Sequence, residues 1–204
     1  MRREESRAPD AKTALVTGAQ RGIGAAIARR LAADGARVWI DAVEELDRAR
    51  ELAAELGGEA LEADVADQRQ VERMLEHVGS LDVLVNNAAD QAYEPLLDVD
   101  PRAWERTLAV NVTGAMLTIR AAAPRMRAGA AIVNVASMHS FVPLAGAAAY
   151  ATSKGALVAL TRQAAVELGE SGIRVTRSRR VRSTSPTMRS AAGPVAIPST
   201  GTCR

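Results

Sequence analysis

The chain has 204 residues, a net charge of +2, 48% hydrophobic and 25% charged residues, which is the composition of one globular domain. No apolar run approaches the roughly 18 residues that span a bilayer, and the charged N-terminus lacks a signal-peptide pattern, so we expect a cytoplasmic protein with no membrane partner. The single cysteine excludes a disulfide framework and a cysteine-based zinc site, and 2% aromatic residues argue against base-stacking nucleic-acid modules.

Short apolar runs alternate with stretches of helical periodicity from residue 12 to residue 176. Strands are predicted at 13–17, 36–40, 60–65, 81–86 and 131–136, with a further one beginning at 173–176. Helices are predicted at 22–34, 44–56, 67–77, 101–123 and 150–168. Continuous apolar strands separated by helices are typical of a parallel sheet covered on both faces. The sequence therefore predicts an α/β fold, a single Rossmann-like domain with a doubly wound parallel sheet.

The pattern ends after residue 176. Residues 177–204 contain six arginines and no acidic residue, and removing these charges from the total of +2 leaves −4 for residues 1–176. This segment has no periodic apolar face, so we expect a disordered basic tail, and a nucleic-acid-binding arm is the alternative. We expect residues 1–11 to be a flexible N-terminus and residues 12–176 to be a domain that is incomplete at its C-terminal end.

A glycine-rich loop follows the first predicted strand and opens the first predicted helix. It reads Thr17-Gly18-Ala19-Gln20-Arg21-Gly22-Ile23-Gly24. Glycines in this place permit a tight turn and a close approach of the backbone to a pyrophosphate, and the helix N-terminus offers free N–H groups to it. The loop predicts a dinucleotide site. The alternative is a turn that needs glycine only for its own geometry.

The spacing T-G-x3-G-x-G and five further motifs resemble the short-chain dehydrogenase/reductase family. The others are Asp64-Val65, Leu84-Val85-Asn86-Asn87-Ala88-Ala89, Asn111 in N-V-T-G, Ser137 after a strand, and Tyr150-Ala-Thr-Ser-Lys154. The resemblance covers residues 12–176. It implies an NAD(P)-dependent oxidoreductase that moves hydride between a nicotinamide cofactor and a secondary alcohol or ketone. It also implies a homo-oligomer, a dimer or tetramer, assembled on helix 150–168.

The rival interpretation is a catalytically impaired or inactive nucleotide-binding remnant of such an enzyme. In the family, the strand beginning near Arg174 leads to a Pro-Gly turn, a substrate lid and a final strand. Here the chain continues as Arg177-Ser-Arg-Arg instead.

The resemblance assigns the cofactor to a set of residues spread over the first half of the chain and the last helix. The set is Gly18, Gln20, Arg21, Gly22, Ile23, Gly24, Asp41, Asp64, Val65, Asn86, Asn87, Ala88, Tyr150 and Lys154. Asp41, at the end of the second strand, is expected to bind the ribose hydroxyls of NAD and to repel the 2′-phosphate of NADP. The family's acid usually falls one residue later, at Ala42, so Asp41 reaches the ribose only if the strand bulges. Arg21 could instead meet a 2′-phosphate; NAD is favoured over NADP.

The candidate catalytic residues are Asn111, Ser137, Tyr150 and Lys154. Tyr150 and Lys154 are four residues apart on one helix, so their side chains share a face, and the lysine ammonium favours the phenolate that can act as a base. Ser137 is expected to hold the substrate oxygen, and Asn111, by resemblance, to position a water next to Lys154. No G-x-S-x-G elbow surrounds Ser137, which excludes a serine hydrolase, and no spaced metal ligands occur. His139 is close enough to Ser137 to line a substrate pocket.

Overall fold

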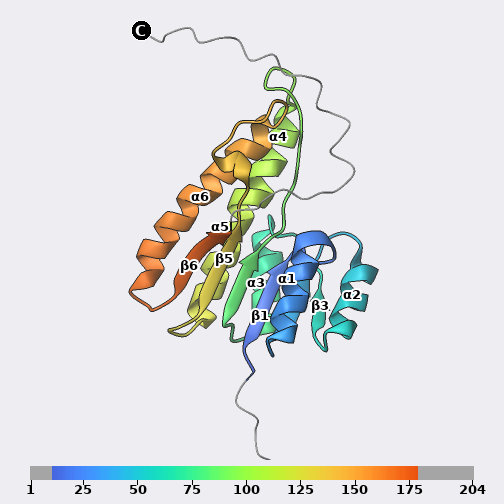
Figure 1. The fold of residues 1–204 in the computed structure, drawn as a ribbon, viewed down its shortest axis with the longest axis vertical. Helices are drawn as coiled ribbons and strands as arrows, with labels where there is room; N and C mark the ends of the chain where they lie inside the picture. Colours follow the sequence, from blue (N-terminus) through green and yellow to red (C-terminus); the bar gives the residue numbers. More distant parts are fainter. Residues whose placement is uncertain (1–10, 179–204) are drawn as a thin grey trace, which may run out of the picture.

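The computed structural model describes residues 11–178, whose six strands form one parallel sheet in the order β3-β2-β1-β4-β5-β6 (Figure 1). The strands are β1 Thr13–Thr17, β2 Arg37–Asp41, β3 Glu59–Leu61, β4 Val83–Asn86, β5 Ala131–Val135 and β6 Arg174–Ser178. The chain steps from β3 at one edge across to β4, beside β1, so the carboxyl ends of β1 and β4 flank the point where the strand order reverses. Ligands bind at such points in open parallel sheets.

Helices cover both faces of the sheet. They are α1 Gly22–Ala33, α2 Leu46–Glu55, α3 Gln68–Val78, α4 Pro101–Leu108, α5 Ala115–Ala122 and α6 Ala148–Gly169. Adjacent residues of β1 show the two layers, because Leu15 packs in one core with α3, α5 and α6, and Val16 packs in the other with α1 and α2. The predicted Rossmann-like, doubly wound sheet is confirmed.

The long helix expected over residues 101–123 is an α-helix only in part. Asp100 caps its start by accepting a hydrogen bond from the backbone N–H of Arg102, with Pro101 in the first turn. Residues Ala109–Gly114 between α4 and α5 form a π-helical segment, η1. Such segments are rare and occur frequently at functional sites. The hydrophobic periodicity of the sequence cannot reveal where a helix widens from i→i+4 to i→i+5 hydrogen bonds.

The structure moves the C-terminal boundary of the expected domain from residue 176 to residue 178. β6 continues through Arg177 and Ser178, which pair with Asn134 and Val135 of β5, so these two residues belong to the sheet and not to a disordered tail. Backbone pairing to β5 extends the strand although neither side chain is apolar. The rest of the predicted tail, residues 179–204, and residues 1–10 of the predicted flexible N-terminus lie outside the described residues. No helix within residues 11–178 is long and apolar enough to cross a membrane.

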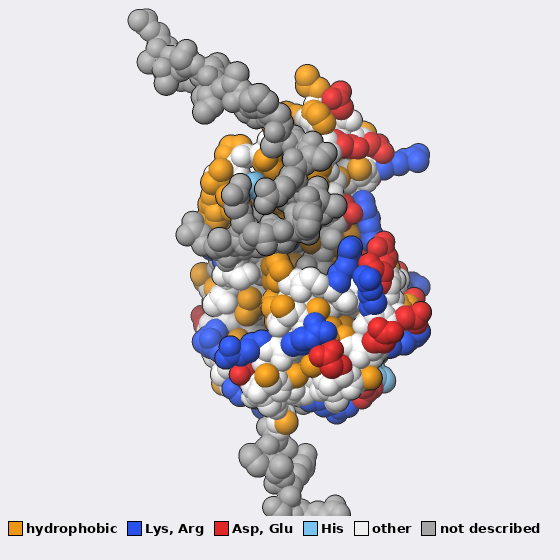
Figure 2. All heavy atoms as spheres, turned by 45° about the vertical axis from the view of Figure 1, so that its right-hand side comes forward, with side chains coloured by type: hydrophobic (Ala, Val, Ile, Leu, Met, Phe, Trp, Pro, Cys, Tyr) orange, Lys and Arg blue, Asp and Glu red, His pale blue; other side chains and the backbone are white. Residues whose placement is uncertain are grey.

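Charged side chains cover the side of the molecule that carries α1 and α2. Arg29 pairs with Glu55, Arg30 with Asp34, and Arg37 with Glu59. Figure 2 shows basic and acidic side chains interspersed over this side, without a broad surface of one sign. Exposed pairs of this kind contribute little to stability, typically below ~1 kcal/mol each.

Candidate active site

The glycine loop joins β1 to α1 in a conformation that needs glycine. Gly18 and Gly22 both have φ of +59°, in the left-handed region that other residues rarely adopt. A Cβ atom on Gly22 would meet nothing within 4 Å among the described residues, so the backbone faces open space there. Arg21 occupies the N-cap position of α1 without a side-chain cap, whereas Asp67 caps α3. The uncapped N–H groups and the space beside Gly22 fit a pyrophosphate.

The same loop lies against the end of β4. A Cβ atom on Gly18 would come within 2.7 Å of Ala88 Cα, and one on Gly24 within 2.6 Å of Asn87 Nδ2. Asn87 Nδ2 donates to the carbonyls of Thr17 at 2.9 Å and Gly18 at 2.8 Å. The structure thus brings together Gly18, Gly24, Asn87 and Ala88, which the sequence placed about 70 residues apart.

Thr17 opens the glycine-loop motif, but sequence reasoning assigned it no role in the site. Its hydroxyl oxygen accepts hydrogen bonds from the backbone N–H groups of Asn87 and Ala88, both at 3.0 Å. A threonine at a strand end carries no signal by itself. Only the pairing of β1 with β4 shows that it anchors the loop after β4 to the glycine loop.

The side chain of Asn86, predicted to contact the cofactor, takes part in a buried hydrogen-bond network. The Asn86 side chain is buried, where its Nδ2 donates to Asn134 Oδ1 at 2.9 Å and its Oδ1 accepts from Thr118 Oγ1 at 2.7 Å. Asn134 in turn donates to Thr161 of α6 at 2.9 Å. These bonds tie α5, β4, β5 and α6 together, so the amide of Asn86 serves the scaffold. Buried polar groups of this kind require such partners.

Asp41 also lies differently from the expectation that it binds the adenosine ribose. Its side chain is 1% exposed, and Oδ1 has no hydrogen-bond partner among residues 11–178. Burial raises the pKa of Asp41 to about 8, with the backbone N–H groups of Ala63 and Gly18 opposing the rise and the charge of Asp64 adding to it. β2 does not bulge here, since Asp41 stays in register with Thr17. The carboxyl group therefore points into the protein.

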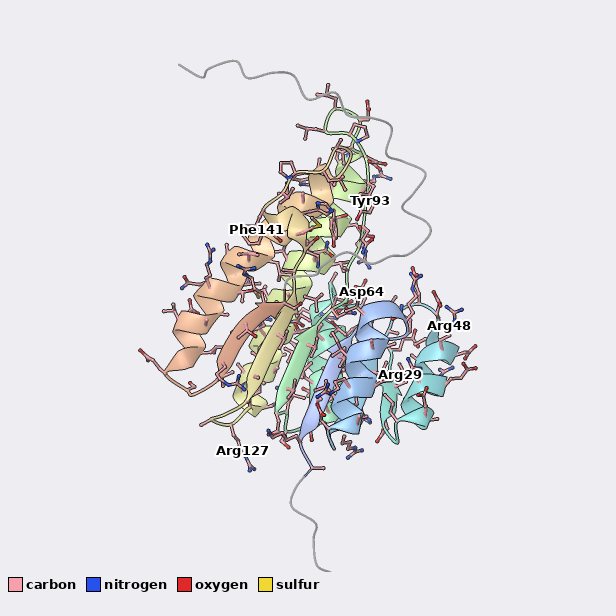
Figure 3. All side chains as sticks on the ribbon, in the orientation of Figure 1. Arg29, Arg48, Asp64, Tyr93, Arg127 and Phe141 are labelled. Carbon is pink, nitrogen blue, oxygen red and sulfur yellow. The ribbon has the colours of Figure 1, made fainter. Side chains whose placement is uncertain are left out.

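Three charged side chains lie beyond the end of β2. Glu45 pairs with Arg21 at 3.4 Å and with Arg48 of α2. Glu45 has a φ of 51°, and the arginine side chains are about two-thirds exposed. Figure 3 shows Arg48 on α2 and Asp64 at the carboxyl edge of the sheet, with Arg127 at the opposite edge. Two arginines and one glutamate thus stand beside the glycine loop.

The predicted catalytic residues meet where β5 ends against α6. Tyr150 and Lys154 are both buried in α6, and Lys154 Nζ lies 5.7 Å from the centre of the Tyr150 ring. Lys154 Nζ donates to the Val135 carbonyl at 3.0 Å, two residues before Ser137. Ser137 is buried too, and its hydroxyl oxygen accepts from the His139 N–H at 3.2 Å. A phenol, an ammonium and a hydroxyl thus converge on the end of β5.

Asn111 lies in the π-helical segment η1 and faces the same region. Its Oδ1 accepts from the Asp90 N–H at 2.8 Å, and its Nδ2 donates to the Asp90 carbonyl at 2.9 Å and to Ser153 Oγ at 2.9 Å. The amide therefore connects the loop after β4 with α6, next to Tyr150 and Lys154. A cavity of about 10 Å³, room for roughly one water, is lined by Asn111, Thr17 and Asn86 among others.

Tyr93 is a second residue that sequence reasoning missed. Its ring lies 5.6 Å from the ring of Tyr150 at an angle of 42°, and it comes from the loop that precedes α4. Figure 3 places Tyr93 above the carboxyl edge of the sheet. The sequence contains only two tyrosines, but a contact across 57 positions has no local signal. Tyr93 supplies an aromatic wall beside the candidate catalytic phenol.

Comparison with known proteins agrees with this geometry. The family model described as short chain dehydrogenase matches residues 12–179. Sorbitol dehydrogenase of Cereibacter sphaeroides is 38% identical over 175 residues, which are 81% of this chain and 68% of the relative. D-threitol dehydrogenase of Mycolicibacterium smegmatis is 40% identical over 178 residues, 81% and 68% of the two chains. The chain thus spans about two-thirds of the length of these relatives.

Solved structures give the same result. A short chain dehydrogenase from Burkholderia cenocepacia in complex with NADP is 41% identical, with a TM-score of 0.79, over 81% of this chain and 72% of that one. A blue fluorescent protein from a metagenomic library in complex with NADPH is 40% identical, with a TM-score of 0.78 and the same coverage. Nothing in these comparisons supports the rival of an inactive remnant. The chain belongs to the short-chain dehydrogenase family of NAD(P)-dependent oxidoreductases, which act on small-molecule alcohols or ketones.

Proposed function

We propose that Tyr150 is the acid/base of this oxidoreductase and that Ser137, Lys154 and Asn111 support it. The main supporting observation is that Tyr150 and Lys154 are buried side by side on α6. Lys154 donates a hydrogen bond to the carbonyl of Val135, the last residue of β5, two residues before Ser137. The bound nicotinamide supplies the hydride chemistry. Tyr150 takes the hydroxyl proton of a secondary alcohol, or returns it to a ketone oxygen. Ser137 donates a hydrogen bond to that oxygen and holds it beside the phenol.

Lys154 and Asn111 assist the transfer of the proton that Tyr150 exchanges with the substrate. The ammonium beside the Tyr150 ring stabilises the phenolate. Asn111 holds α6 through Ser153 and lines the small cavity, which has room for roughly one water to pass the proton onward. Tyr93 packs on the Tyr150 ring and reduces the access of bulk water to the phenol.

We propose that the cofactor's pyrophosphate lies on the glycine loop and the N-terminus of α1, with the adenine beside Asp64 and Val65. Gly18, Gln20, Gly22, Ile23 and Gly24 supply the loop. Asn87 and Ala88 form the adjoining wall at the end of β4.

We further propose that NADP(H), and not the NAD favoured from the sequence, is the preferred cofactor. Asp41 is buried and uncharged over much of the neutral pH range, so it does not repel a 2′-phosphate. Ala42 occupies the position where the family carries its acid. The guanidinium groups of Arg21 and Arg48 both pair with Glu45 in this structure. We propose that they exchange this carboxylate for the 2′-phosphate, because a phosphate carries more negative charge than a carboxylate.

Calorimetric titration with NADP and NAD tests the cofactor proposal. Arg21→Gln is expected to weaken NADP binding about tenfold and to change NAD binding less than twofold, because only NADP carries the 2′-phosphate. Arg29→Gln, on the same helix but paired with Glu55, is the matched control. Tighter binding of NAD than of NADP by the unaltered protein would refute the preference.

Turnover is measured by the appearance of reduced cofactor at 340 nm with a panel of secondary alcohols. The panel includes sorbitol, threitol and 3-hydroxybutyrate, because dehydrogenases with these names are among the relatives. Cofactor binding without turnover of any alcohol or reduction of any ketone would contradict the proposed activity.

We also propose a homo-oligomer assembled through the outward face of α6. Val166 is 74% exposed there. Helices with apolar residues on two sides commonly meet a partner subunit.

A further inference from the structure

An ion pair connects α4 to the loop that follows β3. Arg106 Nη1 lies 2.8 Å from Asp64 Oδ2, with the Arg106 side chain 48% and the Asp64 side chain 25% exposed. A half-exposed pair of this kind adds little to stability. Its place is more informative, because Asp64 lies at the carboxyl edge of the sheet, where the cofactor is proposed to bind (Figure 3).

The Asp64 carboxylate is held on both oxygens. Oδ1 accepts from the backbone N–H of Ala66 at 2.9 Å, while Oδ2 accepts from Arg106. The backbone N–H of Asp64 donates to Gln70 Oε1 at 3.0 Å, which fixes the residue itself. A carboxylate oxygen has two lone-pair sites, so each oxygen still has one for a further donor. The carboxylate is therefore oriented and still able to accept a hydrogen bond.

The loop with Asp64 and Val65 lies along the helix formed by α4 and η1. A Cβ atom on Gly114 would be 2.8 Å from Val65 Cγ2 and 3.1 Å from the Val65 carbonyl oxygen, so the helix and the loop touch there without a side chain between them. Arg106 makes the second contact, eight residues earlier on the same helix. Thr107, next to Arg106, donates its hydroxyl to Asp90 in the loop after β4. The last turn of α4 thus joins the loops after β3 and β4.

We propose that Arg106 is a positioning residue that sets the enzyme's preference for a 6-aminopurine base. By holding Oδ2, Arg106 aims the Asp64 carboxylate so that it accepts a hydrogen bond from the exocyclic amine of adenine. A 6-oxopurine presents an oxygen to the same carboxylate and is repelled. This inference rests on the proposed contact of Asp64 with adenine.

The test compares NADP with its 6-oxopurine analogue, nicotinamide hypoxanthine dinucleotide phosphate. The unaltered protein should bind NADP at least tenfold more tightly than the analogue, which corresponds to about 1.4 kcal/mol. Arg106→Met should weaken NADP binding about tenfold and analogue binding less than twofold, because only the amine depends on the oriented carboxylate. KM for NADP should rise while kcat at saturating NADP stays unchanged. Arg106→Lys, which keeps the charge, should recover part of the preference.

Arg102→Met, one turn earlier on α4 and exposed, is the matched control and should leave both affinities unchanged. Thermal melting shows whether each variant is folded. Equal binding of both bases by the unaltered protein refutes the role of Asp64 and with it this inference. A clear preference that survives in Arg106→Met refutes Arg106 alone and leaves the proposed function standing. Equal weakening of both cofactors, or a loss of kcat, shows a general structural effect and also refutes the positioning role.

Discussion

The carboxyl group of Asp41 is inside the protein next to the glycine loop, and this determines how it titrates. An aspartate in the unfolded chain has its ordinary pKa of 3.8, whereas burial raises the pKa of Asp41 to about 8 in the folded protein. The folded state therefore binds this proton more tightly. The contribution to stability is complete below pH 4 and is lost as the pH rises towards 8.

Asp41→Asn tests this directly, because asparagine has the same shape and no charge. We expect the free energy of unfolding of the unaltered protein to fall between pH 5 and pH 8 by up to ~1.4 kcal/mol per pH unit, and the fall to be much smaller in the variant. Chemical denaturation across this range gives both slopes. Asp47→Asn, at an exposed carboxylate of α2, is the control and should keep the slope of the unaltered protein. Equal slopes for Asp41→Asn and the unaltered protein would contradict the raised pKa.

Tyr150→Phe removes one hydroxyl and keeps the ring that packs on Tyr93. We expect kcat to fall by roughly 10² to 10⁴, the usual contribution of acid–base catalysis, and NADP affinity to change less than twofold. Tyr93→Phe is the matched control, because it makes the same change at the neighbouring ring, and it should retain near-normal kcat. Steady-state kinetics and calorimetry together give both quantities. Near-normal turnover by Tyr150→Phe would mean that another group is the base.

At the scale of elements, the junction between β1 and α1 depends on a glycine with open space beside it. Gly22→Val places a branched side chain where the pyrophosphate is proposed to lie, at a φ that also strains the backbone. We expect NADP binding to fall below detection in calorimetry, together with a stability loss of ~1–2 kcal/mol from the left-handed backbone.

Gly35→Val is the matched control for that strain. Gly35 follows the other end of α1, has a φ of +88° and also has no described atom within 4 Å of an added Cβ. The same substitution there should cost similar stability and leave NADP binding intact. If both variants bind NADP equally well, the glycine loop is not the pyrophosphate site.

The helix from α4 through η1 to α5 shows how one element serves several parts of the site. Arg106 and Thr107 end α4 with bonds to Asp64 and Asp90, and Asn111 follows in the π-helical segment with bonds to Asp90 and Ser153. The wider turn of η1 changes the faces that later residues present. One helix thus orders the loops after β3 and β4 and braces α6.

At the scale of the whole molecule, the two layers of helices differ in what they carry. α1 and α2 cover one face and stand beside the proposed pyrophosphate and 2′-phosphate positions, while α6 on the other face carries Tyr150 and Lys154. Figure 1 shows α4 and α6 extending beyond the carboxyl ends of the strands, and Figure 3 shows Tyr93 on the same side of the sheet.

Assembly belongs to this scale. Val166→Asp places a charge on the outward face of α6, where burial against a partner subunit would leave it without compensation. We expect sedimentation equilibrium to give a dimer or tetramer for the unaltered protein and a monomer for the variant. Val43→Asp, the same substitution at an exposed valine between β2 and α2, is the control and should keep the oligomer. A monomeric unaltered protein would refute the assembly proposal.

The sequence by itself determined the order and type of the elements, the glycine loop and the pairing of Tyr150 with Lys154. These are local features: apolar periodicity reports which side of a segment is buried, glycine reports backbone freedom, and a spacing of four on a helix places two side chains together. The start of α3 at its Asp67 cap was predictable for the same reason.

Only the tertiary structure decided which polar side chains face the cofactor's side. Asp41 and Asn86 both stand at strand ends, yet Asp41 is buried beneath the glycine loop and Asn86 bonds to Asn134 and Thr118, because neighbouring elements surround each of them. Long-range contacts likewise assign three further residues to the site, namely Thr17, Tyr93 and Arg106. Burial and hydrogen-bond partners depend on the packing of distant segments, and a local pattern contains no information about that packing.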